Sequence, residues 1–281
     1  MIEIFPGIFS DSYSEKDLEG ILLNSEGREI GLFLDLDGTI HRGMFNGLFY
    51  NSSSADLAFL LLPYAIKHGI DSVLNYAADG VYFTSKVLAY KMGIKRLERE
   101  QDLLSIVEEF SERVLTRFYY EEVHAAARSI SRFSYPYSIS TLSQISRNYK
   151  KTVLISTTFY PVLEEYVKKI GENIFHIEAY ATKLLERDGR ILGILGKVVD
   201  SYQKKKFLIQ SAESLEGAVL FLNADEDLEM LSAAENIFGR KNTIKIAINK
   251  PTMGVINASD FYVKSWKSIY ALINRTKKAI I

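Results

Sequence analysis

The sequence predicts an α/β protein with a mainly parallel sheet and an inserted module that consists only of helices. Three observations support this fold class. Short apolar runs of the kind that form buried parallel strands recur along the chain. Polar or acidic residues directly follow several of them, as at the strand ends where open α/β sheets bind ligands. From about residue 41 to 147, between two such runs, the pattern is mostly helical.

The composition is that of a folded globular chain. Of its 281 residues, 47% are hydrophobic and 25% are charged, which excludes a disordered chain. The formal net charge of -1 gives no electrostatic footprint for nucleic acid. The chain has no cysteine, which excludes disulfides, thiolate catalysis and cysteine-bound zinc and fits a reducing compartment. The four histidines lie far apart in sequence and are interpreted as packing or surface residues.

No targeting or membrane segment is recognisable in the sequence. The first ten residues lack the basic start and the apolar core of a signal peptide. The longest apolar run lies near Leu57 to Ile66, is interrupted by Pro63 and is too short to span a bilayer. We therefore expect a soluble cytoplasmic protein without a membrane or nucleic-acid partner.

Residues 1–30 precede the first long strand and are expected to cover an edge of the sheet. The segment Ile2–Phe5 has the composition of a short strand. Ser14, followed three residues later by Asp17, indicates the capped start of a helix.

Two carboxylates follow the first long strand, which ends in Leu32-Phe33-Leu34. Asp35 and Asp37 are two residues apart, so in an extended segment their side chains point to the same side. Acids so close repel each other unless a cation lies between them, and Mg²⁺ prefers oxygen ligands. Gly38 permits a sharp exit from the strand, and Thr39 offers a hydroxyl. The alternative, an Asp-rich solvated turn, does not require so long an apolar run before it.

The helical segment after these acids is predicted to be a separate cap domain. We assign residues 1–40 and 148–281 to a core domain and residues 41–147 to the cap. Apolar residues recur at helical spacing from Leu57 to Tyr64 and from Leu103 to Leu115. A helical module that begins directly after the acidic turn suits a lid over the site. The alternative is a helical subdomain without contact to substrate. The segment 134–140, SYPYSIS, is predicted to be a linker.

The next strands also end in polar side chains. Thr152–Ile155 is predicted to be a strand that ends at the hydroxyl of Ser156, and a helix is predicted from Pro161 to Gly171. A hydroxyl and backbone amides at a helix N-terminus suit a phosphate oxygen. The alternative for Ser156 is an ordinary helix cap.

Three consecutive lysines open the helix that is predicted after Asp200. Lysines on a helix are usually solvated, but one of them could neutralise the carboxylates and a phosphate. By position we favour Lys204, and then Lys205. The dipeptide Asp188-Gly189 predicts a hairpin before this helix.

The last part of the chain contains a second acidic cluster. The apolar run Ala218–Leu222 is followed by Asn223-Ala224-Asp225-Glu226-Asp227. Further strands are predicted at Thr243–Ile248 and Phe261–Val263, and a closing helix from Trp266 to Lys278.

Four segments now stand in the order found in phosphatases of the haloacid dehalogenase (HAD) superfamily. Asp35-Leu36-Asp37-Gly38-Thr39 resembles the first motif, Ser156 the hydroxyl of the second and Lys204 the lysine of the third. Asp227-Leu228-Glu229-Met230-Leu231 resembles the end of the fourth. The chain is thus similar to the phosphoserine phosphatase-like branch, which implies a Rossmann-like core and a C1-type helical cap.

The resemblance implies a Mg²⁺-dependent phosphomonoester hydrolase that acts on a small phosphorylated metabolite. Asp35 would attack phosphorus and form an aspartyl phosphate, and Asp37 would be the acid and base. The phosphate would be bound by Thr39, Ser156 and Lys204. The metal would be held by Asp35, Asp37, Asn223 and Asp227.

One position departs from the family pattern. Asn223 stands where the fourth motif usually has an aspartate that binds the metal, so one anionic ligand is replaced by a neutral oxygen. This position supports one alternative, a degenerate fold that binds a phosphorylated ligand or partner without turnover. A second alternative, a phosphotransferase, stays open because nothing in the sequence excludes it. In the cap, Arg113 and Arg117 are one helical turn apart and are candidate ligands for an anionic substrate group. The alternative for this pair is a solvated helix face.

Overall fold

A computed structural model describes residues 1–23, 27–44, 52–91, 99–171 and 176–279. In these ranges, eight strands form one sheet with the order β1-β2-β10-β9-β8-β3-β4-β5. The strands of this sheet are β1 (Ile2–Phe5), β2 (Ile8–Ser10), β3 (Ile30–Leu34), β4 (Lys151–Phe159), β5 (Ile177–Thr182), β8 (Gly217–Leu222), β9 (Thr243–Ile248) and β10 (Phe261–Val263). The five neighbouring pairs from β10 to β5 are parallel, whereas β1 and β2 are antiparallel additions at one edge. The predicted mainly parallel sheet and the predicted strand at Ile2–Phe5 are confirmed.

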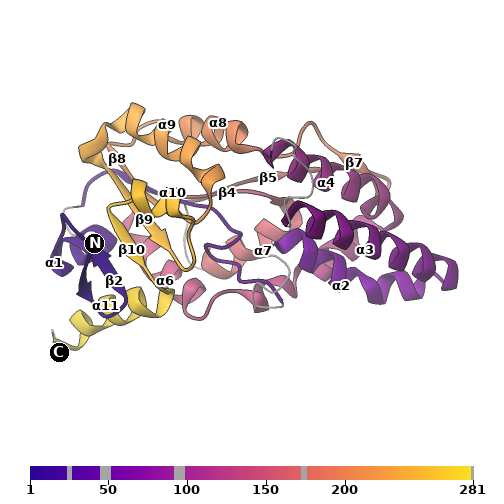
Figure 1. Cartoon of the computed structure of the whole chain (residues 1–281), viewed down its shortest axis with the longest axis horizontal. Helices are drawn as coiled ribbons and strands as arrows, with labels where there is room; N and C mark the ends of the chain where they lie inside the picture. Colours follow the sequence, from indigo (N-terminus) through magenta and orange to yellow (C-terminus); the bar gives the residue numbers. More distant parts are fainter. Residues whose placement is uncertain (24–26, 45–51, 92–98, 172–175, 280–281) are drawn as a thin grey trace.

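Helices occupy both faces of this sheet and the insertion after β3 (Figure 1). The helices around the sheet are α1 (Glu15–Leu23), α6 (Ser138–Ile145), α7 (Tyr160–Gly171), α8 (Ser201–Ser211), α9 (Leu228–Phe238), α10 (Met253–Ala258) and α11 (Trp266–Ala279). The insertion contains α2 (Ser53–Lys67), α3 (Ile70–Lys91), α4 (Arg99–Arg113) and α5 (Tyr120–Ala127). The short 3-10 helices are η1 (Leu115–Arg117), η2 (Ile130–Phe133), η3 (Ser146–Asn148), η4 (Asp225–Asp227) and η5 (Arg240–Asn242).

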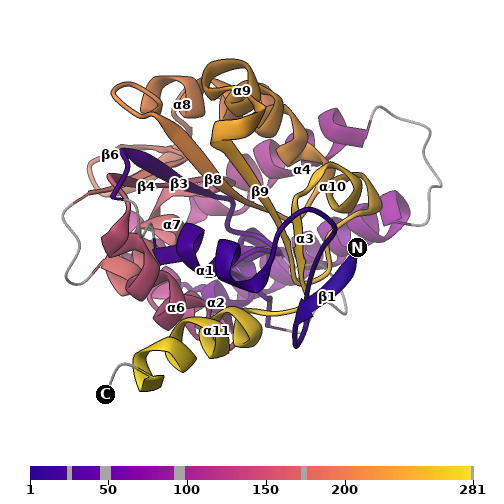
Figure 2. The same ribbon diagram turned by 90° about the vertical axis from the view of Figure 1, so that its left-hand side faces the viewer.

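The sheet lies between two hydrophobic layers, because neighbouring residues of its strands point to opposite faces. On β3, Leu32 and Leu34 pack in the cluster that includes α1, α7 and α11, whereas Phe33 packs in the cluster with α8, α9 and α10. Figure 2 shows α11 and α1 on one side of the strands and α8 and α9 on the other. Strands that are buried on both faces read as continuous apolar runs, which is why these segments were recognisable in the sequence.

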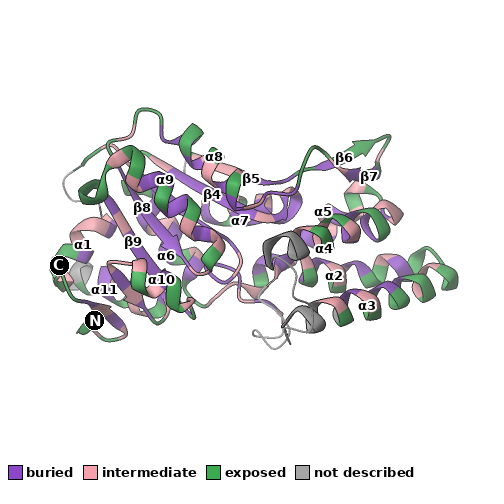
Figure 3. Ribbon diagram, turned by 45° about the horizontal axis from the view of Figure 1, so that its top comes forward, coloured by how far each residue is buried: buried purple, intermediate pink, exposed green. Residues whose placement is uncertain are grey.

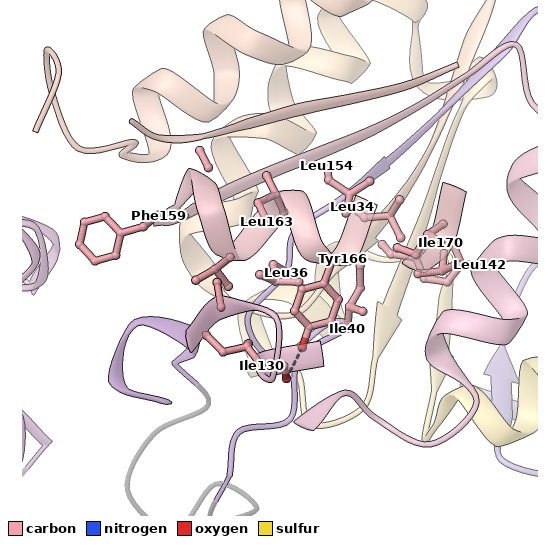
Figure 4. Packing of buried hydrophobic residues seen from close by; sticks show 14 of the residues in the cluster. Leu34, Leu36, Ile40, Ile130, Leu142, Leu154, Phe159, Leu163, Tyr166 and Ile170 are labelled. Carbon is pink, nitrogen blue, oxygen red and sulfur yellow. Dashed lines mark hydrogen bonds between the residues drawn. The ribbon is translucent and has the colours of Figure 1, made fainter. Parts of the chain in front are cut away.

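The first of these layers reaches from the sheet to the segment that enters the cap. Figure 4 shows Leu34 and Leu154 from two adjacent strands against Leu163 and Tyr166 of α7, with Leu36 and Ile40 beside them. The Tyr166 hydroxyl lies 3.4 Å from the carbonyl oxygen of Ile130, to which it donates. The segment after β3 is therefore fixed to the core layer.

The inserted helices extend away from the sheet at one end of the molecule (Figure 1). The predicted, mostly helical character of this segment agrees with the structure in its described part, 41–44, 52–91 and 99–147, in which 41–44 are not helical. Two details differ. Helix α4 ends at Arg113, so that Arg117 lies in the 3-10 helix η1 and not on the same helix. Helix α6 begins at Ser138, inside the predicted linker, and packs on α7 and α11 of the core. The boundaries of the cap at residues 41 and 147 stay a prediction.

Between β5 and α8 the chain forms a separate hairpin of β6 (Leu184–Arg187) and β7 (Arg190–Ile194). Its turn residues Asp188 and Gly189 both have positive φ, 53° and 79°, as a two-residue hairpin turn of the primed type requires. The predicted hairpin at Asp188-Gly189 is confirmed. Among the described residues, no helix is long and apolar enough to cross a membrane.

Candidate active site

The two predicted catalytic acids follow β3, which lies between β4 and β8 in the middle of the sheet. Asp35 is buried, with 5% of its surface exposed, and Asp37 is half-buried. The carboxyl end of a central parallel strand is where this class of sheet places its ligands. The fold therefore places both acids where the sequence predicted a site.

Distant residues fix the turn after the acids. Gly38 has a φ of +79°, a conformation that glycine adopts without strain. The Asn249 side-chain amide donates to the carbonyl oxygens of Gly38 and Thr39, at 2.9 and 2.8 Å. The Trp266 indole also donates to the carbonyl of Thr39, at 2.7 Å. These bonds satisfy buried carbonyls that a tight turn would otherwise leave unpaired.

Lys204 links the first acid to the acidic cluster after β8. Its Nζ lies 3.1 Å from Asp35 Oδ1 and 2.8 Å from Asp227 Oδ1, and all three side chains are buried. Asp200 caps the helix α8 by accepting from the backbone N–H of Gln203, which places Lys204 on the first turn. Lys205 is half-buried and Lys206 is exposed, so Lys204 is the lysine that faces the acids.

The pKa values at this cluster reflect burial and crowding of charge. Burial, reinforced by Asp227 and Asp37 and opposed by Lys204, raises the pKa of Asp35 to about 8. Burial acts to lower the pKa of Lys204, but Asp227 and Asp35 outweigh it and raise that pKa. Two acids therefore contact one buried lysine, and a third, Asp37, lies two residues from Asp35. This excess of negative charge is the electrostatic condition under which a cation is stabilised.

Both carboxylate oxygens of Asp227 have partners. Besides Lys204 on Oδ1, its Oδ2 accepts from the backbone N–H groups of Asn223 and Ala224, at 3.1 and 3.2 Å. Asp227 therefore shapes the loop and orients Lys204. The metal role of Asp227 stays a prediction.

Asn223 faces the turn after β3. Its Nδ2 donates to the carbonyl of Ile248 at 2.8 Å, which fixes the orientation of the amide. A Cβ built on residue 38 would collide with Asn223 Oδ1, so that oxygen lies against Gly38. An amide oxygen next to the glycine that follows Asp37 suits a hard cation such as Mg²⁺. In the described part of the chain, no group of three or more His, Asp or Glu side chains is arranged to hold a metal. The fit of Mg²⁺ thus depends on oxygens from carboxylate, amide and main chain together.

A residue that sequence reasoning missed holds Asp37. The backbone N–H of Ser53 lies 3.0 Å from Asp37 Oδ1, and the Ser53 hydroxyl lies 3.2 Å from Oδ2. That hydroxyl is also 2.6 Å from Thr158 Oγ1 on β4. Burial raises the pKa of Asp37, while the charge of His41 and the bonds from Ser53 oppose the rise. Because Ser53 is the first residue of α2, the cap helix begins at the proposed acid and base.

A buried histidine network lies beside this contact. His41 is fully buried, with Nε2 3.0 Å from Asp56 Oδ2 on α2 and Nδ1 2.7 Å from the Tyr166 hydroxyl on α7. Asp56 also accepts from the backbone N–H of Met44, at 2.7 Å. The network ties α2 to the core next to Asp37. The lone histidine gave no sign of this in the sequence, because its partners lie 15 and 125 residues away.

The predicted phosphate-binding hydroxyls are both buried. Ser156 Oγ, at the end of the apolar part of β4, accepts from the backbone N–H of Thr158 at 3.3 Å. Its hydroxyl hydrogen remains available as a donor. Thr39 Oγ1 is buried without a hydrogen-bond partner among the described residues. A buried hydroxyl without a partner is costly, so it gains if a ligand oxygen binds it.

The two cap arginines converge on a buried aspartate. Arg113 Nη2 and Arg117 Nη2 lie 2.8 and 2.7 Å from Asp79 of α3, which is 3% exposed. Arg113 also pairs with Glu109. Arg117 Nη1 is buried without a hydrogen-bond partner in the described ranges. A structural role in the cap thus accounts for the known contacts of both arginines, and their contact with substrate stays a prediction.

Comparison with solved structures identifies the fold. The chain is similar to a cytosolic 5′-nucleotidase IIIB bound to cytidine, with 12% identity, a TM-score of 0.64, and coverage of 98% of this chain and 95% of that one. It is also similar to a phosphoserine phosphatase in a phospho-aspartyl intermediate analogue form, with 19% identity, a TM-score of 0.54, and coverage of 85% and 94%. A HAD family hydrolase, t0658 from Salmonella enterica subsp. enterica serovar Typhi, matches with 12% identity, a TM-score of 0.57, and coverage of 89% and 75%.

At these identities the likeness establishes the fold, which is that of the HAD hydrolases. No family model matches the chain, and no curated protein matches its sequence. The expected HAD fold is confirmed.

Proposed function

We propose that the protein is a Mg²⁺-dependent phosphomonoester hydrolase that acts through an aspartyl phosphate on Asp35. The observation that supports this most strongly is the Asp35–Lys204–Asp227 cluster at the end of β3, with Asp37 two residues from the nucleophile. A buried carboxylate with one oxygen bonded to a lysine is oriented and keeps a second oxygen for attack. The structural likeness to a nucleotidase and a phosphoserine phosphatase supports the same reaction class.

In the first step the Oδ2 atom of Asp35 attacks phosphorus, and the bond from phosphorus to the leaving oxygen breaks. Asp37 gives its proton to that oxygen, which requires a carboxyl that is protonated near neutral pH. Burial favours this state because it raises the pKa of Asp37. In the second step Asp37 takes a proton from water, which attacks the phosphorus and releases Asp35 and phosphate.

The charge on the transferred group is balanced by this chain's donors. Lys204 lies beside the nucleophile, and we assign the hydroxyls of Thr39 and Ser156, both buried, as further donors to phosphoryl oxygens. Mg²⁺ would be held by the Asp35 carboxylate, the main-chain carbonyl of Asp37 and Asn223 Oδ1. When bound, it supplies positive charge next to the phosphoryl oxygens.

The substrate is proposed to be a small phosphorylated metabolite in the cytoplasm. Nucleoside 5′-monophosphates and phosphoserine are the first compounds to test, because the similar structures include a 5′-nucleotidase and phosphoserine phosphatases. The experiment is a Mg²⁺-dependent phosphate-release assay on p-nitrophenyl phosphate and on this panel, with wild type and Asp35→Asn. We expect hydrolysis by wild type that Asp35→Asn abolishes. Equal turnover by both proteins would contradict the assignment.

The neutral side chain of Asn223 supports one alternative, a fold that binds a phosphorylated ligand without hydrolysis. Calorimetric titration of the protein with the same panel of compounds distinguishes this binding function from hydrolysis. Binding without release of phosphate, at Mg²⁺ concentrations that saturate the protein, would favour the binding function.

A further inference from the structure

The two longest helices of the cap expose an apolar face at the end of the molecule away from the sheet. We define the α2–α3 apolar face by eight exposed apolar residues of the two helices: Phe59, Leu62, Ile66, Ile70, Leu74, Ala77, Ala78 and Val81. The six large side chains of this set each expose between 40% and 77% of their surface. Figure 3 shows exposed positions along both helices. This exposure is at the upper end of the apolar surface that a soluble monomer exposes in one patch, and such patches often mark interaction sites.

The spacing of the set is that of a helix-packing seam. On α2 the residues follow at intervals of three and four, through Phe59, Leu62 and Ile66. On α3 the intervals are four, three and four, through Ile70, Leu74, Ala77 and Val81, and Ala78 lies next to Ala77. These are the intervals of the a and d positions of helices that pack against other helices. Leu57, Leu61 and Ala65 supply a separate buried face of α2, so the exposed stripe is an additional one.

The two stripes lie side by side. The Tyr76 hydroxyl donates to the carbonyl of Ala58, which marks the side of α2 that faces α3. Leu62 lies one turn beyond Ala58, so the exposed stripe of α2 begins next to α3. On α3, Asp79 binds arginines of the α4–η1 segment, and the stripe lies on the opposite side of that helix. Tyr76 and Asp79 are buried positions of α3, and Leu57 and Leu61 are buried positions of α2, so both exposed stripes lie on the outer side of the helix pair.

We propose that the α2–α3 apolar face is the interface of a homodimer, in which the helix pairs of two copies pack as a four-helix arrangement. Its occupant is thus a second copy of this chain. The six large side chains expose on the order of 600 Å² per copy, so two copies would bury on the order of 1,200 Å², which reaches the range of stable interfaces. An apolar surface with the same spacing on both partners is self-complementary under a two-fold axis.

Charge argues against other occupants. Lys67 and Asp71 are the exposed charged residues at the connection of the two helices, and they have opposite signs. Helices that lie on anionic membranes carry many lysines and arginines beside their apolar face. This pair of helices therefore offers no electrostatic attraction to lipid head groups or to nucleic acid, and favours a neutral apolar surface like its own.

The experiment is sedimentation velocity of the full chain from about 1 to 100 μM, which covers ordinary dimer affinities. We expect wild type to be dimeric in the upper part of this range. Leu74→Glu places two like charges in the interface and should weaken the dimer by on the order of 100-fold or more. Asn75→Glu is the matched control, because Asn75 is exposed on the same helix but lies outside the stripe. Circular dichroism establishes that both variants are folded.

A labelling measurement gives a second, independent readout. The chain has no cysteine, so Ala78→Cys provides a single thiol on the α2–α3 apolar face. Its rate of maleimide labelling should fall about tenfold as the protein associates. Gln210→Cys on the exposed part of α8 should be labelled at a constant rate. Wild type that stays monomeric, a dimer unaffected by Leu74→Glu, or equal labelling of the Ala78→Cys variant at all concentrations would each overturn the proposal. If the monomer sediments with phosphatidylcholine vesicles instead, the face is a lipid-contact surface.

Discussion

Ser53 binds both carboxylate oxygens of Asp37, one through its backbone N–H at 3.0 Å and the other through its hydroxyl at 3.2 Å. This single residue of the cap fixes the side chain that we propose as acid and base. Because Ser53 opens α2, the position of the cap and the orientation of Asp37 are coupled. His41 and Asp56 secure the same region through a 3.0 Å contact.

Ser53→Ala should impair catalysis without removing it. The substitution deletes one of the two hydrogen bonds that orient the Asp37 carboxyl, which contributes about 0.5–1.5 kcal/mol, so we expect kcat/KM to fall roughly threefold to tenfold. The bond favours the ionised carboxylate, and its loss should raise the pKa of Asp37 further. The limb of the pH–rate profile that reports Asp37 should therefore move to higher pH. Ser54→Ala, on the same turn, is the control, and an identical profile in both variants would refute the role of Ser53.

Lys204→Met should abolish most of the activity. It leaves Asp35 and Asp227 buried without the cation between them, and we expect kcat to fall by on the order of 100-fold or more. Lys206→Met changes an exposed lysine of the same helix and should keep wild-type kinetics. Steady-state rates of the two variants at saturating Mg²⁺ test this. Similar rates in both would exclude Lys204 from the site.

Asn223→Asp should lower the Mg²⁺ concentration that gives half-maximal activity. The substitution adds an anionic oxygen for a hard dication. It also removes the Nδ2 group that donates to the Ile248 carbonyl, so the metal-free variant should lose about 1 kcal/mol of stability. Asp227→Ala should raise the Mg²⁺ requirement, since it frees Lys204 and two loop amides. Superimposable Mg²⁺ titrations for wild type and Asn223→Asp would place Asn223 away from the metal.

The stability of the metal-free protein should fall as the pH rises from about 4 to about 8. The cause of this fall in stability is Asp35, whose pKa in the folded state is about 8 and lies above the reference value of 3.8. Between these values the folded state binds more protons than the unfolded state, so deprotonation favours unfolding. Asp35→Asn should flatten this dependence and be more stable than wild type near pH 8 by on the order of 1–3 kcal/mol. Urea unfolding of wild type and of Asp35→Asn, with EDTA in the buffer, measures the free energy of unfolding of each protein across this pH range. Parallel pH dependences of the two proteins would contradict the prediction.

Local patterns predicted much of the core and of the site. The alternation rule placed Asp35 and Asp37 on one side of a strand end, and the strands Thr243–Ile248 and Phe261–Val263 are found at the predicted bounds. Lys204 was favoured among three adjacent lysines by position alone and is the buried one. These features depend on short stretches of chain, where periodicity is informative.

The residues that complete the site were not predictable, because their roles depend on contacts between distant segments. Asn249 and Trp266 lie more than 200 residues from the turn whose carbonyls they bind. Ser53 resembled any other serine at a helix start. Pro63 interrupts an apolar run in the sequence, but helix α2 continues through it. The proline lies on the exposed side of the helix, where water can solvate the backbone carbonyl that loses its N–H partner.

The central claim is that Asp35 carries the phosphoryl group during turnover. Its most direct test is an acid quench of the protein in the presence of Mg²⁺ and a turned-over phosphomonoester, followed by borohydride reduction and peptide mass spectrometry. Reduction converts an aspartyl phosphate to homoserine, so the account predicts homoserine at position 35 in wild type and none in the absence of substrate. Hydrolysis without a modified residue 35, or homoserine at Asp37 or Asp227 instead, would contradict the account.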